Sequence, residues 1–220
     1  MGKNSTATAK AYERLYQAIV NGDLQPNERL IELDLAQRYE VGRAAIRTAL
    51  ARLEQEGLVV HQPHHGARVR AISTQEAIET LEARAVLEGL ATRYAADNAT
   101  DADIAELRSI ITEMEMLLAQ GELLPASDAN VRLHSRLLQI ANHKTVARLV
   151  RHLHAQHIRA QFRLVLAPLR RPHALAEHRA IVEAISAHDP DAAEAAMRRH
   201  LLNIAEALHT AAHSGTQLLE

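Results

Sequence analysis

The sequence predicts a mainly α-helical protein with two domains: a small N-terminal domain of three helices and a hairpin over residues 1–72, and an all-α bundle of six to seven helices over residues 73–220. Three observations predict this class. The chain has 220 residues, which is enough for two compact units. Aromatic residues make up only 2% of it, so the core must be built from Leu, Ile, Val and Ala. Apolar residues recur at helical spacing almost throughout, among many Ala, Leu, Glu and Arg, which favour helices.

The composition excludes several classes of protein. The chain has no Cys, which excludes a disulfide framework, thiolate zinc sites and cysteine nucleophiles. No apolar run approaches the ~18–20 residues that span a bilayer, and the polar start lacks the apolar centre of a secretory signal. We therefore expect a cytoplasmic protein with no membrane partner. Charge is uneven, since residues 1–70 hold ten Lys/Arg against eight Asp/Glu and the remainder holds fifteen against nineteen.

The N-terminal domain shows three helical stretches followed by two short extended ones. Asn21-Gly22-Asp23 ends the first stretch, Val41-Gly42 the second and Gly57 the third, because glycine readily ends helices. A turn at residues 62–66 joins the two extended pieces into a hairpin. The predicted helices are residues 8–20, 32–39 and 43–56, and the predicted strands are residues 58–61 and 67–70.

Helix, turn, helix and a basic hairpin, in this order, form a winged helix-turn-helix domain, whose second helix enters the DNA major groove. Arg43 and Arg47 lie four residues apart, on one face of that helix and near its N-terminus. Arginine donates well to guanine O6 and N7 and to phosphates, so these two residues are the expected DNA contacts. On an isolated helix, such a pair more often only solvates an exposed face.

Residues 10–70 also carry a specific series of motifs that keeps its spacing through both helices and the hairpin. The series is Asn21–Leu30, Leu35-Ala36, Val41-Gly42-Arg43, Ile46-Arg47, Ala49-Leu50, Leu53, Glu56–Val59 and His65–Val69. It resembles the DNA-binding domain of GntR-type transcriptional regulators. The resemblance implies contacts to double-stranded DNA from Arg43 and Arg47, and from the tip of the wing at His64, His65 and Gly66.

Two places depart from the family pattern. Gly42 stands where Ser or Thr is usual, and so lacks a hydroxyl that caps a helix or touches phosphate. Ala44 and Ala45 are small where polar side chains would read bases. We therefore expect base specificity to depend on Arg43 and Arg47, and on contacts of Ala44 with thymine methyl groups.

Residues 73–220 show helical periodicity to nearly the end and no strand pattern. Ser73 or Thr74 is a good cap for the first of these helices. The predicted helices are residues 75–97, 101–120, 125–141, 144–167, 173–188 and 191–213. Such a set of consecutive helices forms an all-α bundle.

Histidine is unusually frequent, with 14 residues, eleven of them after Asn130. His134, His178 and His200 fall on three different predicted helices, each with apolar residues three or four positions later, which places them on core-facing sides. Three imidazoles and one oxygen ligand can hold a divalent metal inside a helix bundle. Spacing alone leaves open the alternative that each is an ordinary core or surface histidine.

A second series of motifs covers residues 74–212. It consists of Glu82-Ala83-Arg84, Leu87-Glu88, Asn130–His134, Glu177–Ile185, Asp189, Ala192-Ala193, Ala196-Met197 and His200-Leu201. This series resembles the effector domain of the FadR subfamily, often called the FCD domain. In many such domains an Asp and three His bind a metal, and a small carboxylate effector completes the coordination. The resemblance implies that His134, His178 and His200 are the three histidine ligands.

Asn130 stands at the position of the Asp, four residues before His134. An Asn offers a carbonyl oxygen but no charge, so all four expected ligands are neutral and the complex keeps the positive charge of the ion. Arg84 lies where an arginine can pair with an effector carboxylate, and a structural pair with a Glu is an equal alternative. The ligand types suit zinc first, and also nickel, cobalt or manganese.

These features predict a transcriptional regulator, not an enzyme, with repression as the expected mode. It would bind a pseudo-palindromic operator as a homodimer, and a small carboxylate at the metal site would control that binding. Two alternatives stay open: a sensor whose effector is the metal ion itself, and a metal-dependent enzyme. The enzyme needs a general base near the metal. Only Glu177 is a candidate, and its place next to His178 is expected to point it elsewhere.

Overall fold

A computed structural model describes residues 2–62, 66–153 and 173–213. Among these residues the chain divides into two compact units, one that ends at Ser73 and one that begins at Thr74. Each unit has its own aliphatic core.

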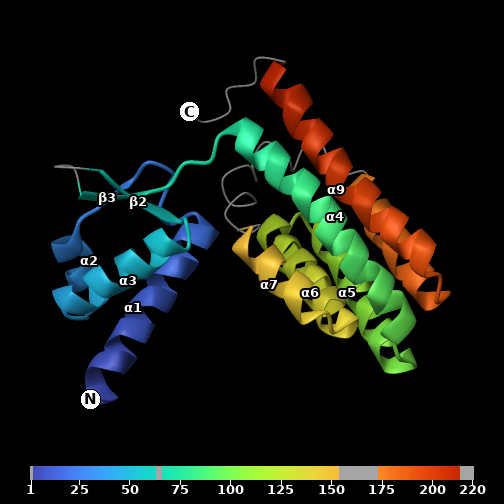
Figure 1. The fold of residues 1–220 in the computed structure, drawn as a ribbon, viewed down its shortest axis with the longest axis horizontal. Coiled ribbons are helices and arrows are strands. Elements are labelled where there is room, and N and C mark those ends of the chain that lie inside the picture. The colour runs from blue at the N-terminus through green and yellow to red at the C-terminus, as the bar shows by residue number, and fades with distance from the viewer. Residues whose placement is uncertain (1, 63–65, 154–172, 214–220) are drawn as a thin grey trace. The chain divides into compact units, whose positions relative to one another are not determined.

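Three helices and a small sheet make up the first unit (Figure 1). The helices are α1 (Gly2–Asn21), α2 (Glu32–Arg38) and α3 (Arg43–Gln55), and the strands are β1 (Arg29–Leu30), β2 (Val59–Gln62) and β3 (Gly66–Val69). The sheet is antiparallel with the order β1-β3-β2, and Val59 pairs with Val69. The apolar faces of the three helices meet under this sheet in one buried cluster that includes Leu15, Ile19, Ile46, Leu50, Leu53 and Leu58.

The turn between α2 and α3 sets the orientation of α3 relative to α2. Glu40 adopts a left-handed conformation with φ of 52°, and the backbone N–H of Val41 donates to the Ala36 carbonyl. Gly42 then caps α3 with extended backbone and no side-chain hydrogen bond, as expected for a residue without a hydroxyl. Because Ile46 and Leu50 face the core, the opposite side of α3 is left in solvent.

The predicted winged helix-turn-helix is confirmed, with two differences in detail. α1 begins at Gly2, six residues before the predicted start, since nothing in that polar segment breaks a helix. β1 was not predicted, because two residues are too few to show a strand pattern. It forms because Leu30 is buried and pairs with Ala67 on β3. His64 and His65 lie outside the described residues.

The second unit is entirely helical in its described part. Its helices are α4 (Thr74–Asn98), α5 (Asp101–Ala119), α6 (Leu123–Ala141), α7 (Lys144–His152), a helix over residues 173–186, and α9 (Pro190–His213). α4 and α9 run antiparallel side by side and make the most extensive helix pair of the unit (Figure 1). The predicted all-α bundle is confirmed. Of the helix predicted over residues 144–167, the part up to His152 is helical and most of the rest lies outside the described residues.

Capping residues explain where several helices begin and end. Thr100 and Asp103 form a capping box at the start of α5, each accepting from the other's backbone N–H. α6 begins two residues before Pro125, which fits the first turn of a helix, where a backbone N–H is not needed. Asn142 ends α6 in a left-handed conformation with φ of 51°.

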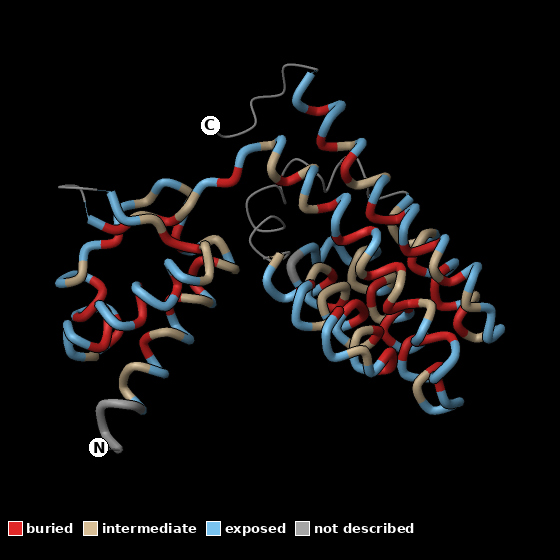
Figure 2. The backbone as a smooth tube through the Cα atoms, in the orientation of Figure 1, coloured by how far each residue is buried: buried red, intermediate tan, exposed pale blue. Residues whose placement is uncertain are grey.

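Buried and exposed positions alternate along these helices with helical period, as Figure 2 shows for α4 and α9. No described helix combines the length and the apolar character needed to cross a membrane. Among the described residues, the interior of the second unit nevertheless contains six polar or charged residues, Arg84, Glu88, Thr92, His134, His178 and His200. Buried polar groups need partners, so this set indicates a candidate site in the second unit.

Candidate metal centre and DNA-contacting surface

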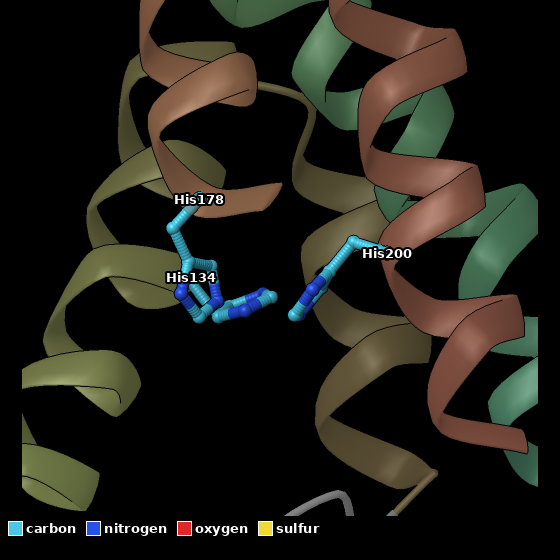
Figure 3. A group of neighbouring side chains, drawn as sticks. All are labelled: His134, His178 and His200. Carbon is cyan, nitrogen blue, oxygen red and sulfur yellow. The ribbon is translucent and has the colours of Figure 1, made fainter. Parts of the chain in front are cut away.

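Three histidines from three helices converge inside the second unit. His134 comes from α6, His178 from the helix of residues 173–186 and His200 from α9, and their side chains point toward one another (Figure 3). Their exposed fractions are 8%, 2% and 2%. The ring centroids of His178 and His200 lie 4.4 Å apart, and that of His134 lies 5.8 Å and 5.5 Å from them.

Helical periodicity brings these side chains inward. Leu137 follows His134 by three residues, Ile181 follows His178 by three, and each of these apolar residues is fully buried. The stripe that packs each helix into the core therefore carries its histidine into the core as well. The prediction that the three residues lie on core-facing sides is confirmed.

Glu88 of α4 contacts the first of the three histidines. Its Oε2 lies 2.7 Å from His134 Nδ1, and its Oε1 accepts from Arg84 Nε at 2.6 Å. Burial opposes ionisation of Glu88, but the charges of Arg84 and His134 and their hydrogen bonds outweigh it and hold the pKa of Glu88 far below its usual range. Arg84 thus makes the pair with a Glu that the sequence left open, and its contact with an effector stays a prediction.

Glu177 contacts the third histidine. Its Oε2 lies 2.8 Å from His200 Nδ1, and its Oε1 accepts from Asn203 Nδ2 at 2.8 Å. The expectation that Glu177 points away from the site is therefore wrong. It failed because Glu177 reaches across to α9, where His200 lies, and adjacency to His178 on its own helix says nothing about that neighbour.

The two carboxylates also fix which histidine atoms remain for a metal. Because Glu88 and Glu177 face the Nδ1 atoms of His134 and His200, a metal would have to be bound through the Nε2 atoms of these two rings. One ligand nitrogen from each of the three histidines lies within 4.8 Å of the others. Imidazoles on one zinc ion at about 2.0–2.1 Å stand roughly 3.4 Å apart, so modest side-chain shifts would bring all three to one ion.

Asn130 offers an oxygen one helical turn before His134 on α6. Its Oδ1 is shielded from solvent and has no hydrogen-bond partner among the described residues. A buried carbonyl oxygen without a donor is costly, and a cation would satisfy it. The donor set of one oxygen and three imidazoles therefore fits a divalent ion of the zinc, nickel, cobalt or manganese type.

The charge around this centre differs from that expected. The four candidate ligands are neutral, but Glu88 and Glu177 stand directly behind two of them. The two carboxylates would therefore offset part of the positive charge of a bound ion, whereas the sequence predicts that the complex keeps this charge in full. Sequence reasoning missed both carboxylates as partners because each lies on a different helix from the histidine that it contacts.

On the first unit, Arg43 and Arg47 project from the solvent side of α3 with side chains 61% and 68% exposed. Both reach Glu32 of α2, which accepts from Arg47 through two bonds of 3.0 Å and lies 3.8 Å from Arg43. The hydrogen bonds from Arg47 keep the pKa of Glu32 below its ordinary value. Glu32 thus holds the two guanidinium groups together on one exposed face.

Ala44 directly follows Arg43 and is exposed, whereas Ala45 is buried in the core. Ala45 is therefore not in a position to meet a base. Gly66 is exposed at the start of β3 with φ of +77°, a conformation that favours glycine.

Comparison with known families agrees with this arrangement. Residues 7–69 match the family described as bacterial regulatory proteins, gntR family, and residues 79–203 match the FCD domain. The second match covers the three histidines, Asn130 and both carboxylates that contact them.

Similar proteins match over nearly the whole chain. An uncharacterised HTH-type transcriptional regulator, YdhC of Bacillus subtilis, is 25% identical over 94% of this chain and 92% of its own. A probable D-xylose utilization operon transcriptional repressor of Paenarthrobacter nicotinovorans is 28% identical over 96% and 91%. The solved structure of McbR/YncC of E. coli shares the fold, with a TM-score of 0.80 and 18% identity over 93% of this chain and 97% of that one.

Proposed function

Because this chain belongs to the gntR family of bacterial regulatory proteins and carries an FCD domain, we propose that it is a transcriptional repressor whose release from DNA needs a divalent metal and a small carboxylate. The family places it among transcriptional regulators with a DNA-binding winged helix-turn-helix. The proposal adds to the family that the chain binds a divalent metal and a small carboxylate effector. It also adds that the protein represses transcription, and that it binds a pseudo-palindromic operator as a homodimer in the cytoplasm.

The observation that carries the proposal is the convergence of three buried imidazoles, one helical turn after an Asn130 oxygen that has no hydrogen-bond partner among the described residues. Burial of three adjacent imidazoles in an aliphatic core costs free energy unless their nitrogens interact with another polar or charged group, and a bound cation would be such a group. A bound divalent ion would supply open coordination positions for a carboxylate oxygen. Asn130, His134, His178 and His200 would hold that ion, and Arg84 stands one turn before Glu88 on the adjoining helix.

On the DNA side, Arg43 and Arg47 would meet base edges and phosphates in the major groove, and the exposed methyl group of Ala44 would contact thymine methyl groups. The wing tip, His64, His65 and Gly66, would contact the neighbouring backbone. Binding of the effector would shift the population of dimers toward a state whose two winged domains no longer match the two half-sites.

An enzymatic role has little support. The catalytic use of a metal requires a general base facing the reacting position. Both oxygens of Glu88 and both oxygens of Glu177 are already taken by protein donors. Among the described residues, neither carboxylate that contacts the histidines is free to take a proton from a metal-bound water.

The test measures metal content and DNA release together. Protein purified without added metal is analysed for bound ions, and a DNA site is selected from a random pool. Gel shifts then compare four conditions: chelated protein and metal-loaded protein, each with and without a panel of small carboxylates. We expect about one ion per chain and release only with metal plus a carboxylate. Release by metal alone would indicate a metal sensor, and a full effector response after exhaustive chelation would overturn the proposal.

A further inference from the structure

Two arginines lie opposite each other on the outer face of the small sheet in the first unit. β1 pairs with β3 in a register that sets Arg29 against Arg68 and Leu30 against Ala67. Leu30 and Ala67 are 3% and 4% exposed, so their side of the sheet packs on the core. Because successive side chains of a strand point to opposite faces, Arg29 and Arg68 both point away from the core, with Cβ atoms about 4.5–5.5 Å apart.

The described residues supply no negative charge to this pair. Arg68 Nη1 donates to the backbone carbonyl of Asn27 at 2.8 Å, which keeps its guanidinium beside β1. Neither Arg29 nor Arg68 forms an ion pair with any carboxylate of the described residues. On the other side of β3, Arg68 is paired with Val60, which is uncharged. The outer face of the sheet therefore carries two neighbouring positive charges without a counter-charge among these residues.

The acidic residue nearest to the pair in sequence is engaged elsewhere. Glu28 directly precedes Arg29, but its Oε2 accepts from the backbone N–H of Gln25 at 2.7 Å. Residues 63–65 and 154–172, which the structure does not describe, contain no Asp or Glu. Like charges directly opposite each other destabilise a strand pair, so the two arginines cost stability that a bound anion would restore.

The pair lies close to the surface that carries the predicted groove contacts. Arg29 lies three residues before Glu32, so their Cα atoms are at most about 11 Å apart. Glu32 in turn accepts from Arg47 and lies 3.8 Å from Arg43. A duplex with α3 in its major groove has a sugar-phosphate strand along each edge of that groove, and phosphate oxygens are the anions nearest to such a helix.

We propose that Arg29 and Arg68 together bind one backbone phosphate of DNA, at a place separate from the groove-facing side of α3 and from the tip of the wing. The inference rests on the DNA binding of the proposed function and adds a phosphate site to it. Guanidinium groups donate parallel N–H bonds to phosphate oxygens, and the phosphate would neutralise part of the repulsion between the two strands. Phosphate contacts carry no sequence information, so the pair would contribute to affinity and not to base discrimination.

The dependence of DNA binding on salt tests this site. The double variant Arg29→Gln, Arg68→Gln and wild type, both as the full chain, are titrated at several KCl concentrations onto a selected site and onto scrambled DNA. Each lost phosphate contact lowers the slope of log affinity against log salt by about one, so we expect that decrease for each chain bound. At 150 mM KCl both DNAs should bind about fivefold more weakly or worse, with the ratio between them unchanged.

Two further variants and one stability measurement control the result. Arg29→Lys keeps a positive charge opposite Arg68 and should keep the wild-type slope. Arg108→Gln removes one exposed positive charge from α5 of the other unit and should also leave the slope unchanged. Urea unfolding should show the double variant to be at least as stable as wild type, because the repulsion between the two strands is gone.

The outcomes separate the inference from the function on which it rests. An unchanged slope in the double variant overturns the inference, and so does a loss confined to the selected site, which would indicate base contacts. Weaker binding together with a lower unfolding midpoint would assign the pair a structural role and overturns it as well. Failure of wild type to bind any DNA, selected or scrambled, overturns the proposed function and the inference with it.

Discussion

At the scale of single residues, the centre is defined by side chains whose partners lie far away in the sequence. His134, His178 and His200 could be predicted as a group, because each falls on the apolar stripe of its helix and the motifs around them are specific. Glu88 and Glu177 could not, because a contact between two helices depends on how they pack. Helical spacing only relates residues on one helix.

The pair of Arg84 and Glu88 yields a prediction about stability. Glu88→Gln leaves the Arg84 guanidinium buried without its counter-charge, and loss of one partner of a buried pair costs about 3–5 kcal/mol. The double variant Arg84→Met, Glu88→Gln should recover part of this loss, because no lone charge remains. Urea unfolding of metal-free protein at neutral pH compares Glu88→Gln, Arg84→Met and the double variant with wild type. If the losses of the single variants simply add in the double variant, the two charges do not stabilise each other.

A second prediction at this scale concerns DNA. Arg43→Ala or Arg47→Ala should cost on the order of 1–3 kcal/mol of discrimination between a selected site and scrambled DNA. Each variant also frees part of Glu32, whose charge then repels phosphate. Gel-shift titrations at fixed salt measure the effect, with Arg108→Ala of α5 as a control for loss of one exposed positive charge. Unchanged binding by the double variant would refute the groove assignment.

At the scale of helices and strands, periodicity and capping residues were sufficient for most of the fold. The boundaries at Asn21, Thr100 and Asn142 follow from turn and cap chemistry that is visible in the sequence. β1 was missed because its two residues gain their conformation from pairing with β3, which comes about forty residues later. Short strands that form only through a distant partner leave no local pattern.

The packing of α4 against α9 gives a prediction for this scale. A Cβ added at Gly89 would lie 2.6 Å from Cγ of Arg198 and 3.4 Å from Cγ of Glu194, so the two helices approach closely there. Gly89→Val should therefore push α9 outward and destabilise the second unit by about 1–3 kcal/mol, the usual cost of overpacking. Ala83→Val, at an exposed position of the same helix, is the matched control. Equal unfolding midpoints for the two variants would show that the contact tolerates a larger side chain.

At the scale of the whole molecule, the chain consists of two units with separate cores, and the candidate metal centre lies in only one of them. The residues proposed to contact DNA, Arg43 and Arg47, lie in the other. The proposed control of DNA binding by an effector therefore requires that occupancy of the second unit change the population of the DNA-competent state of the proposed dimer. A variant that abolishes ligand binding without unfolding either unit separates the two functions.

His178→Ala is that variant. It removes one of the three imidazoles, so metal affinity and the response to carboxylates should be lost, whereas the winged domain keeps its own aliphatic core and should bind DNA as wild type does. His209→Ala is the control, since His209 is an exposed residue of α9, the helix that carries His200. Gel shifts on the selected site, with and without metal plus carboxylate, give the result. We expect His178→Ala to stay bound under conditions that release wild type and His209→Ala. Release of His178→Ala from DNA at the effector concentrations that release wild type would show that the histidine cluster does not mediate control. Failure of His178→Ala to bind DNA even without effector would show that the winged domain depends on the centre for its folding or dimerisation.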